Sequence, residues 1–418
     1  MKEIFSVVIA DVFDHLTYPV YFGVRDFPVF DVVSYEVAKG TAEVFMTPAA
    51  AALSEVMLHN SVNVMSAKRL DLGIVEYPFF THADLDRLSD SWNAKSCNEV
   101  FRVGFRQNLL ATFYDAGHIL GSAGVMLESE SGHTVFYTGD VQFENQSMIP
   151  GADFPESGVD TLIMECTRGG FQRSAHYSRP EEMVRFGQAI ADTLERGGAV
   201  LIPVFAIGKS QEMLFNIHRF KQQGVIPANT PVYFGGLSAK VSLLYDRFSG
   251  LTRRHDHDFK LKEEIQTVPL PRKGKAPLVC TPGNIYVVSS GMMTEKTLSN
   301  VMAEQVLPHE KNAILFVGYA DPDSPAGQLK TTPHGELVKM RPNGQPVRRK
   351  CTIDCFDFSG HATRDSLVDY AVKLNPKQVI LVHGDPDAVE WMHDTLASRM
   401  PDAEIIAPVP GKRYTFDS

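Results

Sequence analysis

Two potential metal ligands lie on either side of a short apolar segment of the sequence. His118 stands in a glycine-rich turn, preceded by Gly117 and followed by Gly121, and Asp140 follows a Tyr-Thr-Gly corner. Imidazole and carboxylate groups are both common ligands of zinc in proteins. A hairpin between them would bring its two ends together, so that both side chains could reach one ion.

Three further residues of suitable chemistry stand at similar corners. His383 follows a short apolar segment, Glu165 ends another, and His361 lies in a turn beside Gly360. His383 is of a metal-binding type, whereas Glu165 and His361 are of the types that transfer protons. Spacing alone does not decide between a metal centre and unrelated structural histidines.

Apolar patterning predicts the elements that would position these residues. Segments 125–127 and 134–137 are predicted to form the hairpin, and 161–165 and 378–382 are short buried strands. Helix signals include Pro48 near the start of one apolar segment. The helices expected around these strands are 49–65, 82–88, 364–373 and 387–399, and a strand is expected at 350–358.

Strands and helices alternate in the middle of the chain, which predicts a parallel sheet with helices on both faces. A helix from Arg179 to about residue 196 opens this part, and residues 250–284 resemble an extended surface connection. The strands are expected at 199–203, 231–234, 285–289 and 313–317, and the helices at 208–222, 237–248 and 297–306.

Composition limits the class of protein. The chain has 418 residues, 44% of them hydrophobic and 22% charged, which indicates a globular protein of roughly two or three domains. No apolar segment approaches the roughly 20 residues of a membrane span. Five cysteines without a Cys-x-x-Cys pair indicate reduced thiols. Asp11 interrupts the apolar segment 4–10, so we expect no secretory signal and a cytoplasmic location.

The formal net charge of −10 excludes a protein that coats itself broadly with nucleic acid. Any nucleic acid would have to bind in a local groove, where a metal could supply positive charge. The acidic balance is equally compatible with a protein that binds no nucleic acid. Solvated loops explain each basic segment alone more simply than phosphate contacts do. The candidate phosphate contacts are Lys339, Arg341, the pair Arg253 and Arg254, and the run Arg348, Arg349 and Lys350.

Taken together, the motifs resemble the β-CASP branch of the metallo-β-lactamase fold, which includes RNA 3′-end-processing nucleases. The motifs that carry the resemblance are Gly117-His118-x-Leu-Gly-Ser-Ala-Gly, Tyr137-Thr-Gly-Asp140, Met164-Glu165-Cys-Thr, Ser289-Ser-Gly-Met, Phe358-Ser-Gly-His361-Ala and Val382-His383-Gly. The resemblance implies an α/β fold, an αββα sandwich with an inserted β-CASP domain. The implied division is 1–175 and 347–418 for the sandwich and 176–346 for the insertion.

The resemblance also implies a role for each residue. His118 resembles a ligand of a first zinc, Asp140 a carboxylate bridging two zincs, and His383 a ligand of the second. His361 resembles the general acid that protonates the leaving oxygen, and Glu165 the acidic residue that orients a histidine.

One departure from the family matters most, because the His-x-His-x-Asp-His signature is absent from the sequence. In one alignment, residues 10–15 are its remnant, and Asp14 and His15 survive as ligands beside Asp140 and His383. In the other, which we favour slightly, residues 30–33 match the strand before the signature and the signature is deleted. His118, Asp140 and His383 would then be the ligands that remain.

Two main functions therefore stay open. The retained residues favour a zinc-dependent hydrolase of RNA phosphodiesters, with single-stranded DNA as a less favoured substrate. The missing signature favours a catalytically silent subunit that binds nucleic acid or a catalytic relative, in a homodimer or a heterodimer. Ester or thioester hydrolysis is disfavoured, because the resemblance implies a cleft suited to a polymer.

Overall fold

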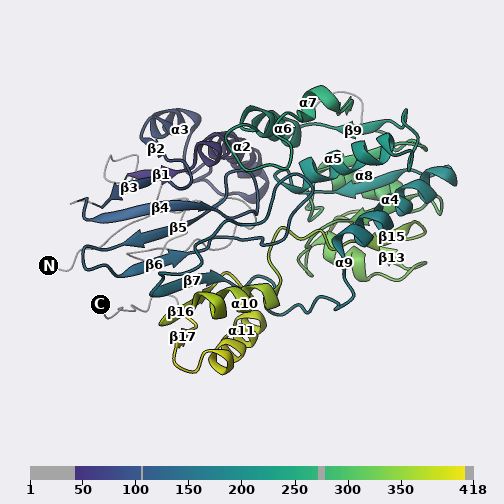
Figure 1. Cartoon of the computed structure of the whole chain (residues 1–418). Coiled ribbons are helices and arrows are strands. Elements are labelled where there is room, and N and C mark those ends of the chain that lie inside the picture. Colours follow the sequence, from purple (N-terminus) through teal and green to yellow (C-terminus); the bar gives the residue numbers. More distant parts are fainter. Residues whose placement is uncertain (1–42, 105–106, 272–277, 410–418) are drawn as a thin grey trace. The chain divides into compact units, whose positions relative to one another are not determined.

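The computed structural model describes residues 43–104, 107–271, 278–409 of the chain. Contacts divide the chain into two compact units (Figure 1). The first unit takes in the described residues up to Asn145, then Ile149–Arg173, and the chain from His361 onward. The second unit consists of Gln146–Met148 and Ser174–Gly360. Asp14 and His15 lie outside the described residues, and the predicted division at residues 176 and 347 stays a prediction.

A seven-stranded sheet forms the centre of the first unit, in the order β17-β16-β7-β6-β5-β4-β3. The predicted hairpin is confirmed: β5 and β6 are antiparallel, with Val125 opposite Tyr137. Strands β6, β7 and β16 are parallel to one another, and β4 runs in the same direction as β6 because both are antiparallel to β5. The strands are β3 (Val100–Val103), β4 (Leu109–Asp115), β5 (Ala123–Glu128), β6 (Thr134–Tyr137), β7 (Thr161–Glu165), β16 (Gln378–Val382) and β17 (Glu404–Ile406).

Helices α10 (Arg364–Leu374) and α11 (Pro386–Arg399) cover one part of this sheet (Figure 1). Leu367 and Val368 of α10 and Met392 and Leu396 of α11 are buried with Leu162 in one core. Burying several such side chains at about 1.5–3 kcal/mol each fixes both helices to the seven-stranded sheet.

A separate small core joins α2 (Pro48–Leu72) and α3 (His82–Ser89) to a two-stranded parallel sheet. That sheet consists of β1 (Val44–Met46) and β2 (Trp92–Ala94). Helix α2 is longer than the predicted 49–65, because no helix breaker occurs before Gly73. Gly73 ends the helix with φ of 66°, a left-handed conformation that glycine adopts without strain.

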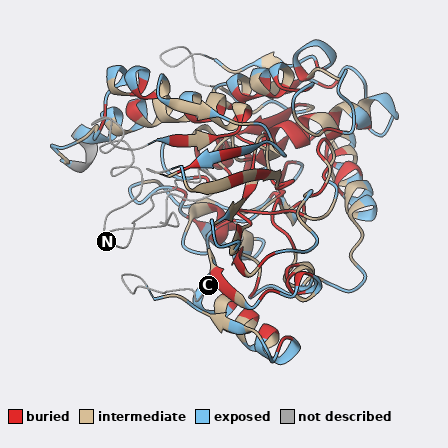
Figure 2. Ribbon diagram, turned by 60° about the vertical axis from the view of Figure 1, so that its left-hand side comes forward, coloured by how far each residue is buried: buried red, intermediate tan, exposed pale blue. Residues whose placement is uncertain are grey.

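The second unit contains a six-stranded sheet in the order β10-β9-β11-β8-β12-β15, in which every pair is parallel. The predicted alternation of strands and helices is confirmed. Buried residues gather in the strands and exposed ones on the outer faces of helices (Figure 2). The elements are α4 (Arg179–Glu195), β8 (Val200–Pro203), α5 (Lys209–Gln222), β9 (Val232–Phe234), α6 (Leu237–Arg247), β11 (Ile285–Val288), α8 (Leu298–Val306), β12 (Ala313–Phe316), α9 (Pro325–Thr331) and β15 (Thr352–Cys355).

Residues 250–284 are less uniform than the predicted extended connection. They contain α7 (Leu261–Glu264), and β10 (Val268–Pro269) pairs with β9 at the edge of the sheet. The carboxylate of Asp246 accepts hydrogen bonds from the backbone N–H groups of Leu261 and Lys262, which starts α7. A small antiparallel pair, β13 (Leu337–Val338) and β14 (Val347–Arg348), precedes β15.

Candidate metal centre

The candidate site lies at one edge of the seven-stranded sheet. Strands β4, β6, β7 and β16 run in the same direction, so their carboxyl ends meet at this edge. His118 follows β4, Asp140 follows β6, Glu165 ends β7 and His383 follows β16. Residues that are up to 265 positions apart in the sequence are thereby brought together (383 − 118).

The loop that carries His118 is held by close backbone packing and by a serine. The Ser122 hydroxyl accepts hydrogen bonds from the backbone N–H groups of His118 and Ile119, at 3.2 and 3.1 Å. Gly117 has φ of 65°, and a Cβ atom there would lie 2.6 Å from the carbonyl oxygen of Gln142. Only glycine therefore fits before His118.

Helix α2 packs against the same loop. The hydroxyl of Thr47, the N-cap residue of α2, donates a 2.7 Å hydrogen bond to the carbonyl oxygen of Gly121. The same hydroxyl accepts a hydrogen bond from the backbone N–H of Ala50 at 3.1 Å. Thr47 thus links the start of the helix to the turn that carries His118.

Asp140 and His383 are in direct contact. Nδ1 of His383 lies 2.6 Å from Oδ1 of Asp140 and 3.2 Å from the hydroxyl of Thr167. His383 has φ of 53°, a left-handed conformation that is uncommon for residues other than glycine. Backbone strain of this kind concentrates at functional sites, where the surrounding structure holds it in place.

Glu165 and His361 form the second contact of the site. Nδ1 of His361 lies 3.0 and 3.1 Å from the two carboxylate oxygens of Glu165. The Glu165 carboxylate also accepts a 2.6 Å hydrogen bond from the backbone N–H of Val141, next to Asp140. Glu165 is 1% exposed, so this carboxylate is removed from water and depends on these partners.

Electrostatics follow from these contacts. Burial raises the pKa of Asp140, but the charge of His361, the hydrogen bond from His383 and the charge of His118 together hold it well below its usual range. Burial lowers the pKa of His383, but the hydrogen bond to Asp140 and its charge outweigh burial and raise that pKa to about 9. The carboxylate of Asp140 therefore stays ionised, which is the form that binds a metal.

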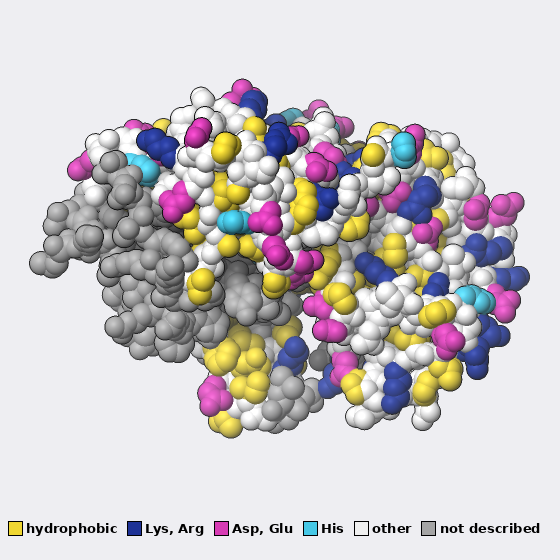
Figure 3. Space-filling view, turned by 90° about the horizontal axis from the view of Figure 1, so that it is seen from below, with side chains coloured by type: hydrophobic (Ala, Val, Ile, Leu, Met, Phe, Trp, Pro, Cys, Tyr) yellow, Lys and Arg dark blue, Asp and Glu magenta, His cyan; other side chains and the backbone are white. Residues whose placement is uncertain are grey.

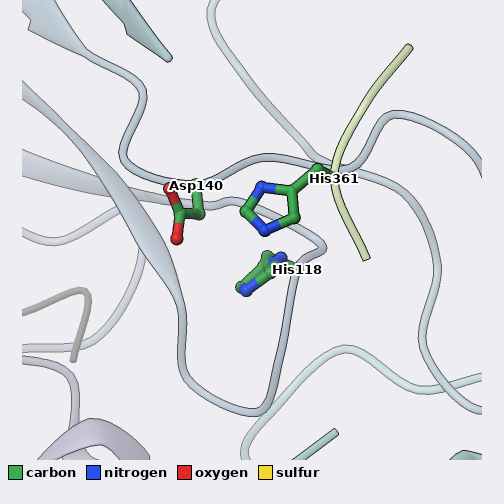
Figure 4. A group of neighbouring side chains, drawn as sticks. All are labelled: His118, Asp140 and His361. Carbon is green, nitrogen blue, oxygen red and sulfur yellow. The ribbon is translucent and has the colours of Figure 1, made fainter. Parts of the chain in front are cut away.

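Two groups of side chains could hold a metal ion among the described residues. One consists of His118, Asp140 and His361, and the other of Asp140, Glu165 and His383. Within each group the ligand atoms lie within 4.8 Å of one another. Figure 4 shows the rings of His118 and His361 and the carboxylate of Asp140 around a common space. Imidazole nitrogens with a carboxylate form a donor set that suits zinc or a similar divalent ion.

The basic residues singled out from the sequence mostly have acceptors within the protein. Arg341 forms a bidentate pair with Glu304, and Arg348 donates to the carbonyl oxygen of Gly335. Arg254 is buried and donates to the carbonyl oxygen of Tyr245. On the face seen in Figure 3, lysine and arginine side chains alternate with aspartate and glutamate. Arg254, Arg341 and Arg348 therefore each have a structural partner within the protein.

Gln142 is a residue of the site that the sequence analysis missed. Its side chain is 1% exposed, and Nε2 donates a 3.0 Å hydrogen bond to the carbonyl oxygen of His361. Its backbone N–H donates to the carbonyl oxygen of Ala116, just before the His118 turn. The feature of the sequence that could have indicated its role is its position two residues after the predicted ligand Asp140.

His255 and His257 form a His-x-His pair in the sequence. Both belong to the second unit, whereas the residues of the candidate metal centre belong to the first. Nε2 of His255 lies 3.0 Å from the carbonyl oxygen of Gln146, and Nδ1 of His257 lies 2.7 Å from that of Ser249. Each ring is thus bonded to a backbone carbonyl, which gives these histidines a structural role.

Comparison with known families agrees with this geometry. Residues 210–329 match the Beta-Casp domain. This segment includes four strands of the parallel sheet of the second unit, β9 to β12. Residues 346–408 match a domain described as "Zn-dependent metallo-hydrolase RNA specificity domain". The chain belongs to the β-CASP family of the metallo-β-lactamase fold. The predicted αββα sandwich with an inserted β-CASP domain is thereby confirmed as the fold class of this β-CASP protein.

Three relatives illustrate the similarity. "Cleavage and polyadenylation specificity factor subunit 3" of Dictyostelium discoideum is 24% identical over 95% of this chain and 53% of that protein. "Transcription termination factor FttA" of Pyrococcus abyssi is 31% identical over 66% of this chain and 44% of that protein. "Probable RNase MJ4" of Methanocaldococcus jannaschii is 28% identical over 65% of this chain and 61% of that protein. The β-CASP chain thus spans about half the length of the curated relatives it matches.

One further comparison concerns membranes. Within the described ranges, none of the helices of this β-CASP protein combines the length and the apolar character needed to span a bilayer.

Proposed function

We propose that this β-CASP chain is a metal-dependent hydrolase of RNA phosphodiester bonds. The observation that carries the proposal is the convergence of His118, Asp140, Glu165, His361 and His383 at one edge of one sheet. The names of the relatives, which include an RNase and a polyadenylation factor, support RNA as the substrate. Single-stranded DNA is the less favoured substrate.

Zinc is the ion that we infer for this site. Asp140 belongs to both candidate groups and stays ionised, so it would hold the metal together with imidazole nitrogens. When bound, the metal would supply Lewis-acid chemistry, polarising a phosphoryl oxygen and providing a nucleophile near neutral pH. Glu165 orients the ring of His361, and the burial of Asp140 and His118 limits access of water to the centre.

The cysteines support a reducing location. All five lie within the described residues and none forms a disulfide bond, and two of them, Cys166 and Cys351, are buried. Since disulfides are rare in the cytosol, we include the cytoplasm in the proposal.

The test combines metal content with RNA cleavage, both measured on the full chain. Purified protein loaded with Zn²⁺ is expected to retain the metal stoichiometrically and to cleave an end-labelled single-stranded RNA. Asp140→Asn removes the charge shared by both candidate groups, so it should lose both the metal and cleavage. His133→Ala is the control, because His133 contacts Thr161 outside the site and should change neither.

A catalytically silent subunit is the second candidate, and the missing His-x-His-x-Asp-His signature favours it. Such a subunit would bind RNA or a catalytic relative, in a homodimer or a heterodimer. Trace metal and absent cleavage, together with RNA binding that Asp140→Asn leaves unchanged, would establish this alternative and exclude the hydrolase.

A further inference from the structure

Two histidines on neighbouring helices of the first unit face each other with the same ring nitrogen. His59 lies in α2, and His82 is the first residue of α3, which packs beside α2 (Figure 1). Their Nδ1 atoms are 2.7 Å apart, whereas the ring centroids are 5.0 Å apart and the ring planes differ by 15°. The two rings therefore meet edge to edge through these nitrogens.

The helices that carry the two histidines are held by contacts of their own. Val62 of α2 and Leu85 of α3 are buried in one core. A capping box fixes the start of α3, where the backbone N–H of Thr81 donates to the Asp84 carboxylate and the backbone N–H of Asp84 donates to the Thr81 hydroxyl. The packing of the helices thus keeps the two rings close together, independently of the contact between them.

The outer nitrogen of each ring faces an oxygen atom. Nε2 of His82 lies 3.3 Å from Oδ1 of Asn63, whose amide nitrogen donates a 2.9 Å hydrogen bond to the carbonyl oxygen of His59. Nε2 of His59 lies 3.4 Å from Oδ1 of Asp86. Amide and carboxylate oxygens only accept, so both Nε2 atoms carry a proton and both Nδ1 atoms of the neutral rings present lone pairs. Two lone pairs 2.7 Å apart repel each other unless a cation lies between them.

We propose that His59 and His82 form an additional metal site, which binds a borderline divalent ion such as Zn²⁺ through both Nδ1 atoms. Imidazole suits such ions. Histidine ligands of metals donate their other ring N–H to a carboxylate or a carbonyl oxygen, and Asp86 and Asn63 supply these oxygens here. None of the four residues belongs to the candidate metal centre, so the inference is independent of the proposed hydrolase function.

The ion requires a small movement of the two rings. Zn–N bonds of about 2.0–2.1 Å place two nitrogens of a tetrahedral site about 3.3 Å apart, so the Nδ1 atoms must separate by about 0.6 Å. His82 is exposed and His59 is half-buried, which leaves both rings room to move and gives the ion a path of entry. Water would complete the coordination.

The experiment titrates Zn²⁺ into the full chain carrying Asp140→Asn, because this change removes the carboxylate shared by both groups of the candidate metal centre. Calorimetry should then detect one remaining ion. His59→Asn or His82→Asn, each added to Asp140→Asn, should weaken its binding more than about 10-fold, the least expected from losing even an outer partner of a ligand. Both changes together should cost little more than either alone, because each already removes chelation.

The new site differs from the candidate metal centre in affinity. With two protein ligands and open access to solvent, it should release its ion during gel filtration, whereas the buried centre retains its own. The titration therefore keeps free Zn²⁺ present throughout. In the unchanged protein, the same weaker step should follow the filling of the candidate metal centre, so the test does not depend on the folding of Asp140→Asn.

His393→Asn is the matched control. His393 is exposed on α11, and its Nδ1 lies 3.1 Å from Oδ1 of Asp394, so it is a surface histidine beside an aspartate. Added to Asp140→Asn, this change should leave Zn²⁺ binding as it was. Circular dichroism of each metal-free variant reports whether the fold is kept.

Hydrogen exchange gives a second reading that does not depend on the heat of binding. An ion bound to both helices opposes their separation. At a free Zn²⁺ concentration of 100 times Kd, local openings that part α3 from α2 should become about 100-fold rarer. The α3 amides of Asp140→Asn should therefore exchange more slowly with Zn²⁺, and those of the variant that also carries His82→Asn should not respond.

The outcomes separate this inference from the proposed function. If no weaker binding step appears, or if the folded His59→Asn and His82→Asn variants bind Zn²⁺ as Asp140→Asn does, a shared proton is the cation between the rings and the inference is overturned. An equal loss in the His393→Asn control would also overturn it, because binding would then be a general property of surface histidines. Neither result changes the hydrolase proposal, which fails only on the retained metal and on RNA cleavage. Loss in both histidine variants but not in the control supports the inference.

Discussion

The two units of this β-CASP protein each bury a glutamate, but they give it different partners. In the first unit, Glu165 accepts hydrogen bonds from His361 and from a backbone N–H. In the second unit, Glu212 pairs with Arg179 and with Lys209, whose Nζ lies 2.6 Å from Oε2. Both glutamates are almost fully buried, at 1% and 4% exposure.

The difference lies in what the partners can do chemically. Arginine and lysine are permanent cations at neutral pH and offer no lone pair to a metal, whereas imidazole offers one. Burial raises the pKa of Glu212, but the charges of Arg179 and Lys209 lower it to about 2. A buried carboxylate is therefore not by itself a sign of function, and its partners decide whether it stabilises the fold through permanent cations or orients an imidazole.

The largest expected effect comes from removing the charge of Glu212. Glu212→Gln leaves Arg179 and Lys209 buried without their counter-charge, which should cost about 3–5 kcal/mol. Hydrogen exchange of the α5 and β8 amides measures this loss in the second unit itself. Bound metal should stay unchanged, and a variant that loses metal while its α5 amides remain protected would break the comparison.

Acid should reproduce part of this loss. The folded pKa of Glu212 is about 2 and its ordinary value is 4.5, so its stabilisation is complete above pH 4.5 and is lost as the pH falls through 2. A depression of this size corresponds to about 3 kcal/mol. Amide exchange of α5 in the unchanged protein and in Glu212→Gln should therefore converge between pH 4.5 and 2. A gap that widens toward low pH would contradict the assigned ion pairs.

Two buried glutamines, Gln142 in the first unit and Gln211 in the second, extend the comparison. Gln142→Leu removes the donor that holds the His361 carbonyl, and it should weaken Zn²⁺ binding about 10-fold or more, or about 1.4 kcal/mol. Gln211→Leu is the matched variant in the second unit, where Gln211 donates to Ser238 and Ser242. Gln211→Leu should reduce the protection of the α5 amides from hydrogen exchange and leave the affinity for Zn²⁺ unchanged. If Gln211→Leu weakened Zn²⁺ binding and Gln142→Leu did not, the roles given to both glutamines would be contradicted.

The smallest effect is expected at the helix that contacts the His118 loop. Thr47→Ala removes the N-cap of α2 and the hydrogen bond to Gly121, at a cost of about 1 kcal/mol. Hydrogen exchange of the first α2 amides measures the loss. Thr47→Ser keeps the hydroxyl and serves as the control, so equal losses in the two variants would show that the hydroxyl is not responsible.

Local patterns predicted most elements, and the corners that carry His118, Asp140 and His383 were predicted from glycines and strand ends. The parallel sheet of the second unit followed from alternation alone. The end of α2 was placed too early, because the sequence between 66 and 72 becomes polar without containing a breaker. Residues 66–69 are exposed, so their polarity reflects contact with solvent and does not end the helix.

What the sequence did not predict depends on distant partners. The hydrogen bond from Gln142 to the carbonyl oxygen of His361 joins residues 219 positions apart, and the one from Arg341 to Glu304 joins residues 37 positions apart. Neither contact has a local signature, since any glutamine or arginine is compatible with a solvated loop. The contact between His361 and Glu165 likewise joins residues 196 positions apart and leaves no local pattern in the sequence.

Glu165 and His361 meet across 196 positions of the chain, a span that contains most of the second unit. Ribosomes add about 5–20 residues per second, so roughly 10 to 40 seconds separate the synthesis of the carboxylate from that of its imidazole. During this interval the nascent chain contains Glu165 but not yet His361. If the site binds a metal as proposed, loading of the ion follows synthesis of the second unit, and a product of interrupted translation that stops inside that unit lacks both His361 and His383.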